Sequence, residues 1–280
     1  MAIIRHIAHH RFLRSTDIAA LVRRSVDRTN DRLLRLFHAG YVDRPRAQLD
    51  YYPTSGSEPM VYALADRGAR LLETQGAGWT RNNERAGRPF LEHQLEVSEF
   101  YVALEKATRE RRDILLIPAG DLVASFPEAT RGMRNPLALR VEVPHAGGII
   151  QIGVVPDLVF GIRFSDGSRR CFFVEIDRGT MPITREDMRQ TSFDRKMRAY
   201  LHAYAERLHE RQFGWRAFRI LTVVRDGHRA RSILSALRQI QVPDTPGALL
   251  FLFAVRDELR TSNPLAYLWH DGAGRDVQLI

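Results

Sequence analysis

The spacing of apolar residues in the first third of the chain predicts short helices and one small hairpin. Helices are expected at residues 17–22, 25–39 and 66–73, and short strands at residues 41–42 and 61–64. The side chain of Ser25 can cap the second helix, and Gly40 is suited to end it. That helix has an apolar side made of Leu33, Leu34, Leu36 and Phe37.

The order helix, tight turn, basic helix, hairpin and helix is that of a winged helix-turn-helix, which we assign to residues 1–75. In such a domain the second helix of the pair lies in the DNA major groove. Arg28 and Asn30 would then contact bases, with Arg32 or Arg35 on phosphates. The alternative is a winged helix that binds another protein, with its arginines solvated.

Residues 76–89 are rich in Gly, Asn and Arg and have no apolar period, which is typical of a linker. The remaining residues, 90–280, predict a second domain. Helices are expected at residues 89–111, 193–212 and 230–240, and strands at residues 114–117, 139–143, 149–162, 170–176, 218–224 and 249–254. This alternation predicts an α/β (α+β) domain with a central mixed sheet flanked by helices.

Three acidic residues lie at one end of a predicted hairpin in this domain. Asp157 begins one strand, while Glu175 and Asp177 end the next and share a face because they are two residues apart. A turn centred between Asp166 and Gly167 would put Asp157 opposite Ile176. A three-residue loop or a bulge would instead put it opposite Glu175 or Asp177.

Such a group of carboxylates repels itself unless a cation or a proton lies among the oxygens. Hard divalent cations take carboxylate and carbonyl oxygens, so the sequence suggests metal-assisted cleavage of a phosphodiester. The alternative is a strand that ends in solvated acids.

Charge and cysteine usage narrow the class of protein. The net charge is +9, and residues 1–90 hold 15 arginines against nine acidic residues, which favours a polyanionic partner such as DNA. No apolar run is long enough to span a membrane, so we expect no membrane partner. The single cysteine, Cys171, suits a cytoplasmic protein and is expected to fill the core.

These features together resemble the PD-(D/E)xK nuclease superfamily, whose core is a helix, a three-stranded meander, a helix and a strand. Pro156-Asp157 and Glu175-Ile176 match its signature of an acid on one strand and Glu-x-Lys on the next. More narrowly, the chain is similar to the bacterial replication-relaxation family of plasmids and mobile elements. The segments that carry this similarity are "YALADRGARLL", "HQLEVSEFYVALE", "PDLVF", "FFVEIDRGT" and "KMRAYLHAY".

The resemblance implies a site that binds Mg²⁺ or Mn²⁺ through Asp157, Glu175 and Asp177, aided by the carbonyl of Ile176. Asp177 occupies the position of the expected lysine, and Lys196 on the following helix could replace that cation. Arg178 is a second candidate for it. Further candidates on the helix at residues 89–111 are His93, Glu96 and Glu99, which are otherwise solvated or hydrogen-bonded helix residues.

Three functions remain open at this point. The first is a DNA-binding protein of a mobile element with an inactive nuclease-like domain, and the second is a metal-dependent DNA endonuclease or nickase. The third is a winged-helix transcriptional regulator. All three bind double-stranded DNA, and a winged helix that reads a palindrome would imply a homodimer.

The N-terminal segment also holds His6, His9 and His10 at helical spacing that suits a metal. A histidine-containing N-terminus that frays is common without one, and this is the default interpretation.

Overall fold

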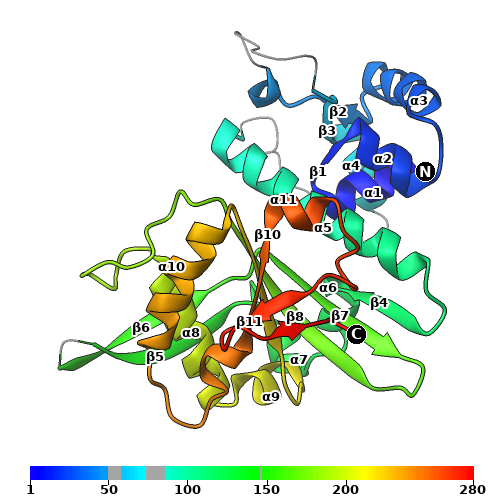
Figure 1. The fold of residues 1–280 in the computed structure, drawn as a ribbon. Helices are drawn as coiled ribbons and strands as arrows, with labels where there is room; N and C mark the ends of the chain where they lie inside the picture. Colours follow the sequence, from blue (N-terminus) through cyan, green and yellow to red (C-terminus); the bar gives the residue numbers. More distant parts are fainter. Residues whose placement is uncertain (50–57, 74–85, 146) are drawn as a thin grey trace. The chain divides into compact units, whose positions relative to one another are not determined.

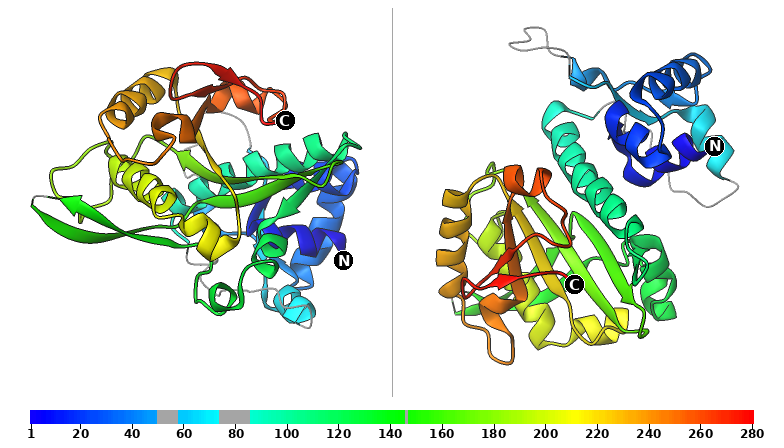
Figure 2. Two further views of the ribbon diagram at one scale, coloured as in Figure 1. Left: turned by 90° about the horizontal axis from the view of Figure 1, so that it is seen from below. Right: turned by 45° about the vertical axis from the view of Figure 1, so that its right-hand side comes forward.

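The computed structural model describes residues 1–49, 58–73, 86–145 and 147–280. The chain forms two compact units, Met1–Lys106 and Ala107–Ile280 (Figures 1 and 2), and each is described by itself. Most of the long helix α5 (Arg88–Arg109) is counted with the first unit, whereas the sequence suggested that it begins the second domain. Most of the predicted linker lies outside the described residues.

The first unit is a small three-stranded sheet packed on helices. Its elements are α1 (Ala2–His10), β1 (Phe12–Arg14), α2 (Ser15–Val22), α3 (Val26–His38), β2 (Val42–Asp43), a 3-10 turn (Arg46–Gln48), β3 (Val61–Leu64) and α4 (Asp66–Glu73). The strands are antiparallel in the order β1-β3-β2. A turn joins α2 to α3, and the β2–β3 pair follows them; the assignment of this unit as a winged helix-turn-helix stays a prediction. Helix α1 and strand β1 were not expected from the sequence, and α1 is a regular helix that buries Ile3, Ile4 and Ile7.

Both ends of α3 are capped as its sequence predicts. The Ser25 hydroxyl oxygen accepts a hydrogen bond from the Arg28 N–H at 3.4 Å. At the other end Gly40 has φ +72, and its N–H donates to the Phe37 carbonyl at 2.9 Å. The Tyr41 N–H donates to the Leu36 carbonyl, which satisfies a second terminal carbonyl. The expected apolar side is correct for Leu33, which is fully buried, but Leu34 is 44% exposed.

The second unit is a seven-stranded mixed sheet with helices and a separate hairpin. Its elements are β4 (Ile114–Pro118), α6 (Ala119–Ala124), α7 (Glu128–Arg131), β5 (Leu139–His145), β6 (Gly148–Val154), β7 (Leu158–Phe164), β8 (Arg169–Asp177), α8 (Phe193–Ala205), α9 (Leu208–Phe213), β9 (Arg219–Val224), α10 (Gly227–Arg238), a 3-10 turn (Gly247–Leu250), β10 (Phe251–Val255), α11 (Arg256–Arg260), β11 (Trp269–Asp271) and β12 (Asp276–Val277). The sheet order is β12-β11-β10-β9-β8-β7-β4.

The central strands of this sheet combine an antiparallel meander with parallel strands. Strands β4, β7 and β8 are antiparallel neighbours, and β9 and β10 continue the sheet parallel to β8. Because parallel neighbours need a crossover, α8 and α9 connect β8 to β9, and α10 connects β9 to β10. The β5–β6 hairpin contacts α8 rather than joining the sheet. The prediction of a central mixed sheet flanked by helices is confirmed.

Two predicted elements are each divided in the structure. The strand expected at residues 149–162 separates into β6 and β7, with Pro156 between them, and proline cannot donate a ladder hydrogen bond. The helix expected at residues 193–212 separates into α8 and α9 at Arg207, whose φ of +54 lies in the left-handed region. No helix within the described ranges combines the length and apolarity needed to cross a membrane.

One face of β8 lines the main core of the second unit. Cys171 and Phe173 lie on this face, and Phe173 contacts the rings of Tyr200 and Trp215 at centroid distances of 5.7 and 5.4 Å. Cys171 is buried in this core, as expected, and the burial raises the pKa of its thiol to about 11. Helices α8 and α10 cover the same face of the sheet (Figures 1 and 2). Glu175 and Asp177 come next on the same face of β8, so two buried acids follow the apolar residues at the end of the strand.

Gly68 provides a test of the packing between α4 and the β2–β3 pair. A Cβ at Gly68 would lie 2.2 Å from the Tyr41 carbonyl oxygen, so Gly68→Ala forces the backbone to move. We expect Gly68→Ala to lower the free energy of unfolding by about 1–3 kcal/mol, despite the higher helix propensity of alanine. Thermal and urea unfolding followed by circular dichroism measure this.

The matched control is Gly120→Ala on α6, where nothing lies within 4 Å of the added atom. It is expected to be neutral or slightly stabilising. Equal stability of the two variants would contradict the close approach of α4 to Tyr41.

Candidate active site

The loop of the β7–β8 hairpin sets which acids meet. Phe164 N–H donates to the Ser168 carbonyl at 2.9 Å, and Gly167 has φ +83, so a three-residue loop closes the hairpin. Leu158 pairs with Val174, and the same register continued by one residue places Asp157 opposite Glu175. This is one of the three pairings that the sequence left open, and it is one that a three-residue loop was expected to give.

Asp157 is held at the start of β7 by two hydrogen bonds to β8. Its N–H donates to the Val174 carbonyl at 3.0 Å. Its Oδ2 atom accepts from the Ile176 N–H at 2.8 Å. The carboxylate is therefore fixed beside Glu175, in a half-buried position at the end of the sheet.

The carboxylate of Glu175 is the most deeply buried acid of the candidate site, at 1% exposure. Its Oε1 atom accepts a hydrogen bond from the Tyr200 hydroxyl at 2.6 Å, and Oε2 pairs with the Lys196 ammonium. Burial raises the pKa of Glu175 to about 7, against the lowering effect of Lys196, and Asp157 raises it further. The pKa of Glu175 is thus raised both by its buried environment and by a second negative charge.

Lys196 and Tyr200 reach Glu175 from one face of α8, because they are four residues apart. The Ser192 hydroxyl oxygen caps this helix by accepting from the Arg195 N–H at 3.2 Å. Burial alone would lower the pKa of Lys196, but Glu175, Asp157 and Asp177 outweigh it and raise that pKa. The ammonium is therefore charged, and its side chain keeps 24% of its surface exposed.

Asp177 does not join this group, although it lies on the same face of β8. Both of its carboxylate oxygens accept from the guanidinium of Arg229 on α10, at 2.7 and 3.0 Å. Arg229 also donates to the Met181 carbonyl at 2.6 Å. Among the described residues, no set of three ligand atoms within 4.8 Å of one another includes these acids. Of the three carboxylates expected to form one cluster, only Asp157 and Glu175 lie together, because Asp177 pairs with Arg229.

The remaining candidates lie elsewhere in the chain. His93, Glu96 and Glu99 are on α5 and are counted with the first unit, so a role for them in the site of the second unit stays a prediction. Glu99 acts within its own unit: burial raises the pKa of Asp17, and Glu99 raises it further. Arg178 is half-buried next to Asp177 and stays an untested alternative to Lys196.

The basic residues expected to bind DNA are all exposed on α3. Arg28, Arg32 and Arg35 are spaced by four and three residues, so they form one stripe along the helix. At about 100° per residue, Asn30 lies roughly 200° around the helix from Arg28 and thus away from the stripe. The four residues do not face one surface, and the continuous positive surface consists of the three arginines.

Sequence reasoning missed two residues that shape the site. Tyr200 could have been found, because it follows Lys196 by one helical turn in the segment "KMRAYLHAY". Arg229 carries no such signal, since its partner Asp177 is 52 residues earlier. The pairing of these two residues depends on the packing of α10 against the sheet.

Comparison with known proteins identifies the family of this chain. The sequence pattern of the family described as replication-relaxation matches residues 4–215, which is more than half of the chain. The chain belongs to the replication-relaxation family. No curated protein matches it. A solved structure titled "Structure of SdaI restriction endonuclease" is similar at 14% identity and a TM-score of 0.23, covering 88% of this chain and 78% of that one.

The buried Glu175 of this replication-relaxation family member predicts a pH dependence of stability. Its pKa rises from an ordinary 4.5 to about 7 on folding, so its contribution is fully present below about pH 4.5 and is lost as the pH rises through 7. We expect the free energy of unfolding of the wild type to fall by on the order of 2–3 kcal/mol relative to Glu175→Gln between pH 4.5 and pH 8. Urea unfolding across this range measures it.

The control is Glu142→Gln, which changes an exposed acid on β5 and should leave the pH profile parallel to that of the wild type. Lys196 stays protonated throughout the range because its pKa is raised. A Glu175→Gln profile parallel to the wild type would contradict the burial effect.

Proposed function

We propose that this replication-relaxation family protein binds double-stranded DNA through its first unit and acts in the replication or relaxation of plasmid or mobile-element DNA in the cytoplasm. The observation that supports DNA binding best is the exposed stripe of Arg28, Arg32 and Arg35 on α3. In a helix-turn-helix the second helix enters the major groove. The stripe would then face the phosphates that border the groove.

Other arginines of the first unit are used inside the fold, which sets the stripe apart. The Arg44 guanidinium lies 4.4 Å from the centroid of the Phe37 ring and donates to the Tyr62 hydroxyl. The Arg67 guanidinium donates to the Ala39 carbonyl at the end of α3. These two arginines stabilise the end of α3 and the neighbouring strands, whereas the three arginines of the stripe are exposed and add positive charge that a polyanion can reach. A homodimer on a palindromic site belongs to the same proposal.

Salt-dependent DNA binding tests the stripe. Arg32→Ala and Arg35→Ala are each expected to weaken binding and to lower the slope of log affinity against log salt by about 1, because each removes one phosphate contact. Fluorescence anisotropy with duplex DNA at several salt concentrations measures both effects.

The matched control is Arg140→Ala, which removes an exposed arginine from β5 of the second unit and should leave the slope unchanged. If all three variants kept the wild-type slope, major-groove binding by α3 would be contradicted. The winged helix would then more simply serve protein contacts.

A second candidate function is a metal-dependent DNA endonuclease or nickase in the second unit. The observation that favours it is the position of Lys196, which pairs with Glu175 beside Asp157 although it comes from a helix and not from β8. An acid, a second acid and a lysine are thereby brought together, as the resemblance to the nuclease superfamily requires. Although Asp177 stands where the strand motif has a lysine, Lys196 would then supply the cation of the site.

The residues present fit a hard cation such as Mg²⁺ or Mn²⁺. Asp157, Glu175 and the Ile176 carbonyl offer only oxygen donors. Thr222 lies in register with Glu175 on β9, and its hydroxyl is buried without a hydrogen-bond partner, as expected where a bound water or ion completes the site. A bound metal would lower the pKa of a water molecule and neutralise charge on the phosphate. Lys196 would orient that water and stabilise negative charge on the phosphate oxygens.

Nicking of supercoiled plasmid tests the second candidate. We expect nicking in Mg²⁺ or Mn²⁺ by the wild type, and a loss of at least about 100-fold in Asp157→Asn, Glu175→Gln and Lys196→Met, since each removes a charge that acts on the transition state. Time courses on agarose gels measure the rates.

Glu142→Gln is the control, and it should nick at the wild-type rate. A wild type that retains salt-sensitive DNA binding without nicking in either metal would exclude the endonuclease and leave a DNA-binding protein with a nuclease-like second unit. Failure of DNA binding as well would remove both candidates.

A further inference from the structure

Two histidines of α1 lie on one face of that helix, one turn apart. His6 and His10 are separated by four residues, which brings their side chains together on the helix surface. The helix itself is anchored by Ile3, Ile4 and Ile7, which are buried in the core of the first unit. The helix is therefore rigidly placed, and its histidine pair has a defined position.

Helix α5 of the same unit brings a carboxylate to this pair. The Ser98 hydroxyl donates to the His10 carbonyl at 3.0 Å, which fixes the end of α1 against α5. Glu105 follows Ser98 by seven residues, or two helical turns, and thus lies on the same face of α5. Its Oε1 atom is 3.2 Å from Nε2 of His10, and the two side chains are only 13% and 1% exposed.

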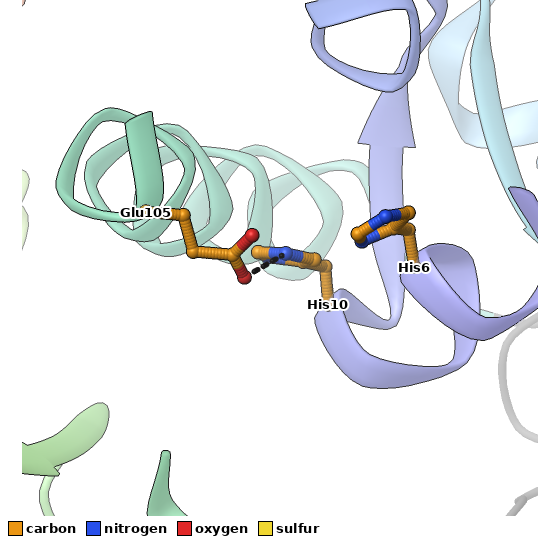
Figure 3. A group of neighbouring side chains, drawn as sticks. All are labelled: His6, His10 and Glu105. Atoms are coloured by element: carbon orange, nitrogen blue, oxygen red, sulfur yellow. Dashed lines mark ion pairs between the residues drawn. The ribbon is translucent and has the colours of Figure 1, made fainter. Parts of the chain in front are cut away.

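The three side chains converge in a way that a simple ion pair does not require. One ligand atom from each of His6, His10 and Glu105 can be chosen so that all three lie within 4.8 Å of one another. Figure 3 shows the ring of His10 between the ring of His6 and the carboxylate of Glu105. Nε2 of His10 is buried and makes no hydrogen bond, although the carboxylate is close. A buried polar atom of this kind is explained by an ion or a water that occupies the space among the three groups.

We propose that His6, His10 and Glu105 form a Zn²⁺ site within the first unit. Two imidazole nitrogens and one carboxylate oxygen are a donor set that zinc uses with a fourth position left to water. Imidazole also selects borderline transition metals over Mg²⁺ and Ca²⁺, which prefer oxygen ligands alone. The metal would join α1 to α5 and so fasten the first helix of the winged-helix unit to the long helix that follows it.

Neighbouring side chains support the arrangement without supplying ligands. The ring of Tyr101 lies 5.3 Å from the ring of His10 and 5.3 Å from that of His9, so it packs beside His10. His9 is exposed and is not part of the convergent group. This difference makes His9 a matched control on the same helix, one position away from a proposed ligand.

The test is zinc binding by the full chain without a histidine tag. Isothermal titration with ZnCl₂ is expected to give one equivalent at micromolar or tighter affinity, and saturating zinc is expected to raise the unfolding midpoint. His6→Ala and Glu105→Gln should each weaken binding by more than about 100-fold, because loss of even an outer-shell partner costs 10–100-fold. His9→Ala should bind as tightly as the wild type. Co²⁺ in place of zinc should give the visible absorption bands of a four-coordinate site in the wild type and in His9→Ala.

Two results would overturn the proposal. One is a wild type that binds no zinc at these concentrations. The other is equal weakening by His9→Ala and His6→Ala, which would mean loose binding to the histidines of the segment. Circular dichroism of each variant confirms that it is folded, and Glu105→Gln, which conserves the shape of the side chain, gives a second decision if His6→Ala unfolds. None of these measurements involves DNA or plasmid cleavage, so they are independent of the proposed function.

Discussion

A carboxylate buried against α8 is the interaction on which the second unit depends most. An ionised acid removed from water is costly unless it is paired and hydrogen-bonded. Lys196 and Tyr200, which both come from α8, offset part of this cost for Glu175, whose pKa is still raised to about 7 by burial. Because α8 lies in the crossover between the parallel strands β8 and β9, the same contacts hold the crossover against the sheet. The chemistry of the candidate site and the packing of the fold are therefore one arrangement of side chains.

The sequence predicts most of the elements because their signals are local. Ser25 and Gly40 bound α3 as their side-chain and backbone properties require, and Pro156 explains why β6 and β7 are separate strands. The register of β7 on β8 was beyond reach, since Ser165-Asp166-Gly167 suits either a two-residue or a three-residue loop. Likewise β1 was missed because it is only three residues long, and its pairing partner β3 begins 47 residues after Arg14. A short strand is specified by its partner, which a local pattern does not reveal.

The candidate site divides in the same way. Asp157, Glu175 and Lys196 could be named from their strand and helix positions, and the structure brings them together. Asp177 could not be assigned from the sequence, since its partner Arg229 is on α10, a separate element packed on the same face. Removal of either member would leave the other charge buried without compensation, which is far more costly than the loss of an exposed ion pair. Asp177 and Arg229 thus fasten α10 to β8.

The two candidate metal sites differ in chemistry, so one ion would not serve both. Asp157, Glu175 and the Ile176 carbonyl offer only hard oxygen donors next to an ammonium, a set suited to a weakly held Mg²⁺ or Mn²⁺ that exchanges with substrate. His6, His10 and Glu105 offer two imidazoles in a largely buried position, a set suited to a tightly held transition metal. A magnesium concentration that filled the first site would leave the second unoccupied, because imidazole is a poor ligand for Mg²⁺. Zinc bound at the proposed second site would therefore stabilise the first unit without competing for the candidate active site.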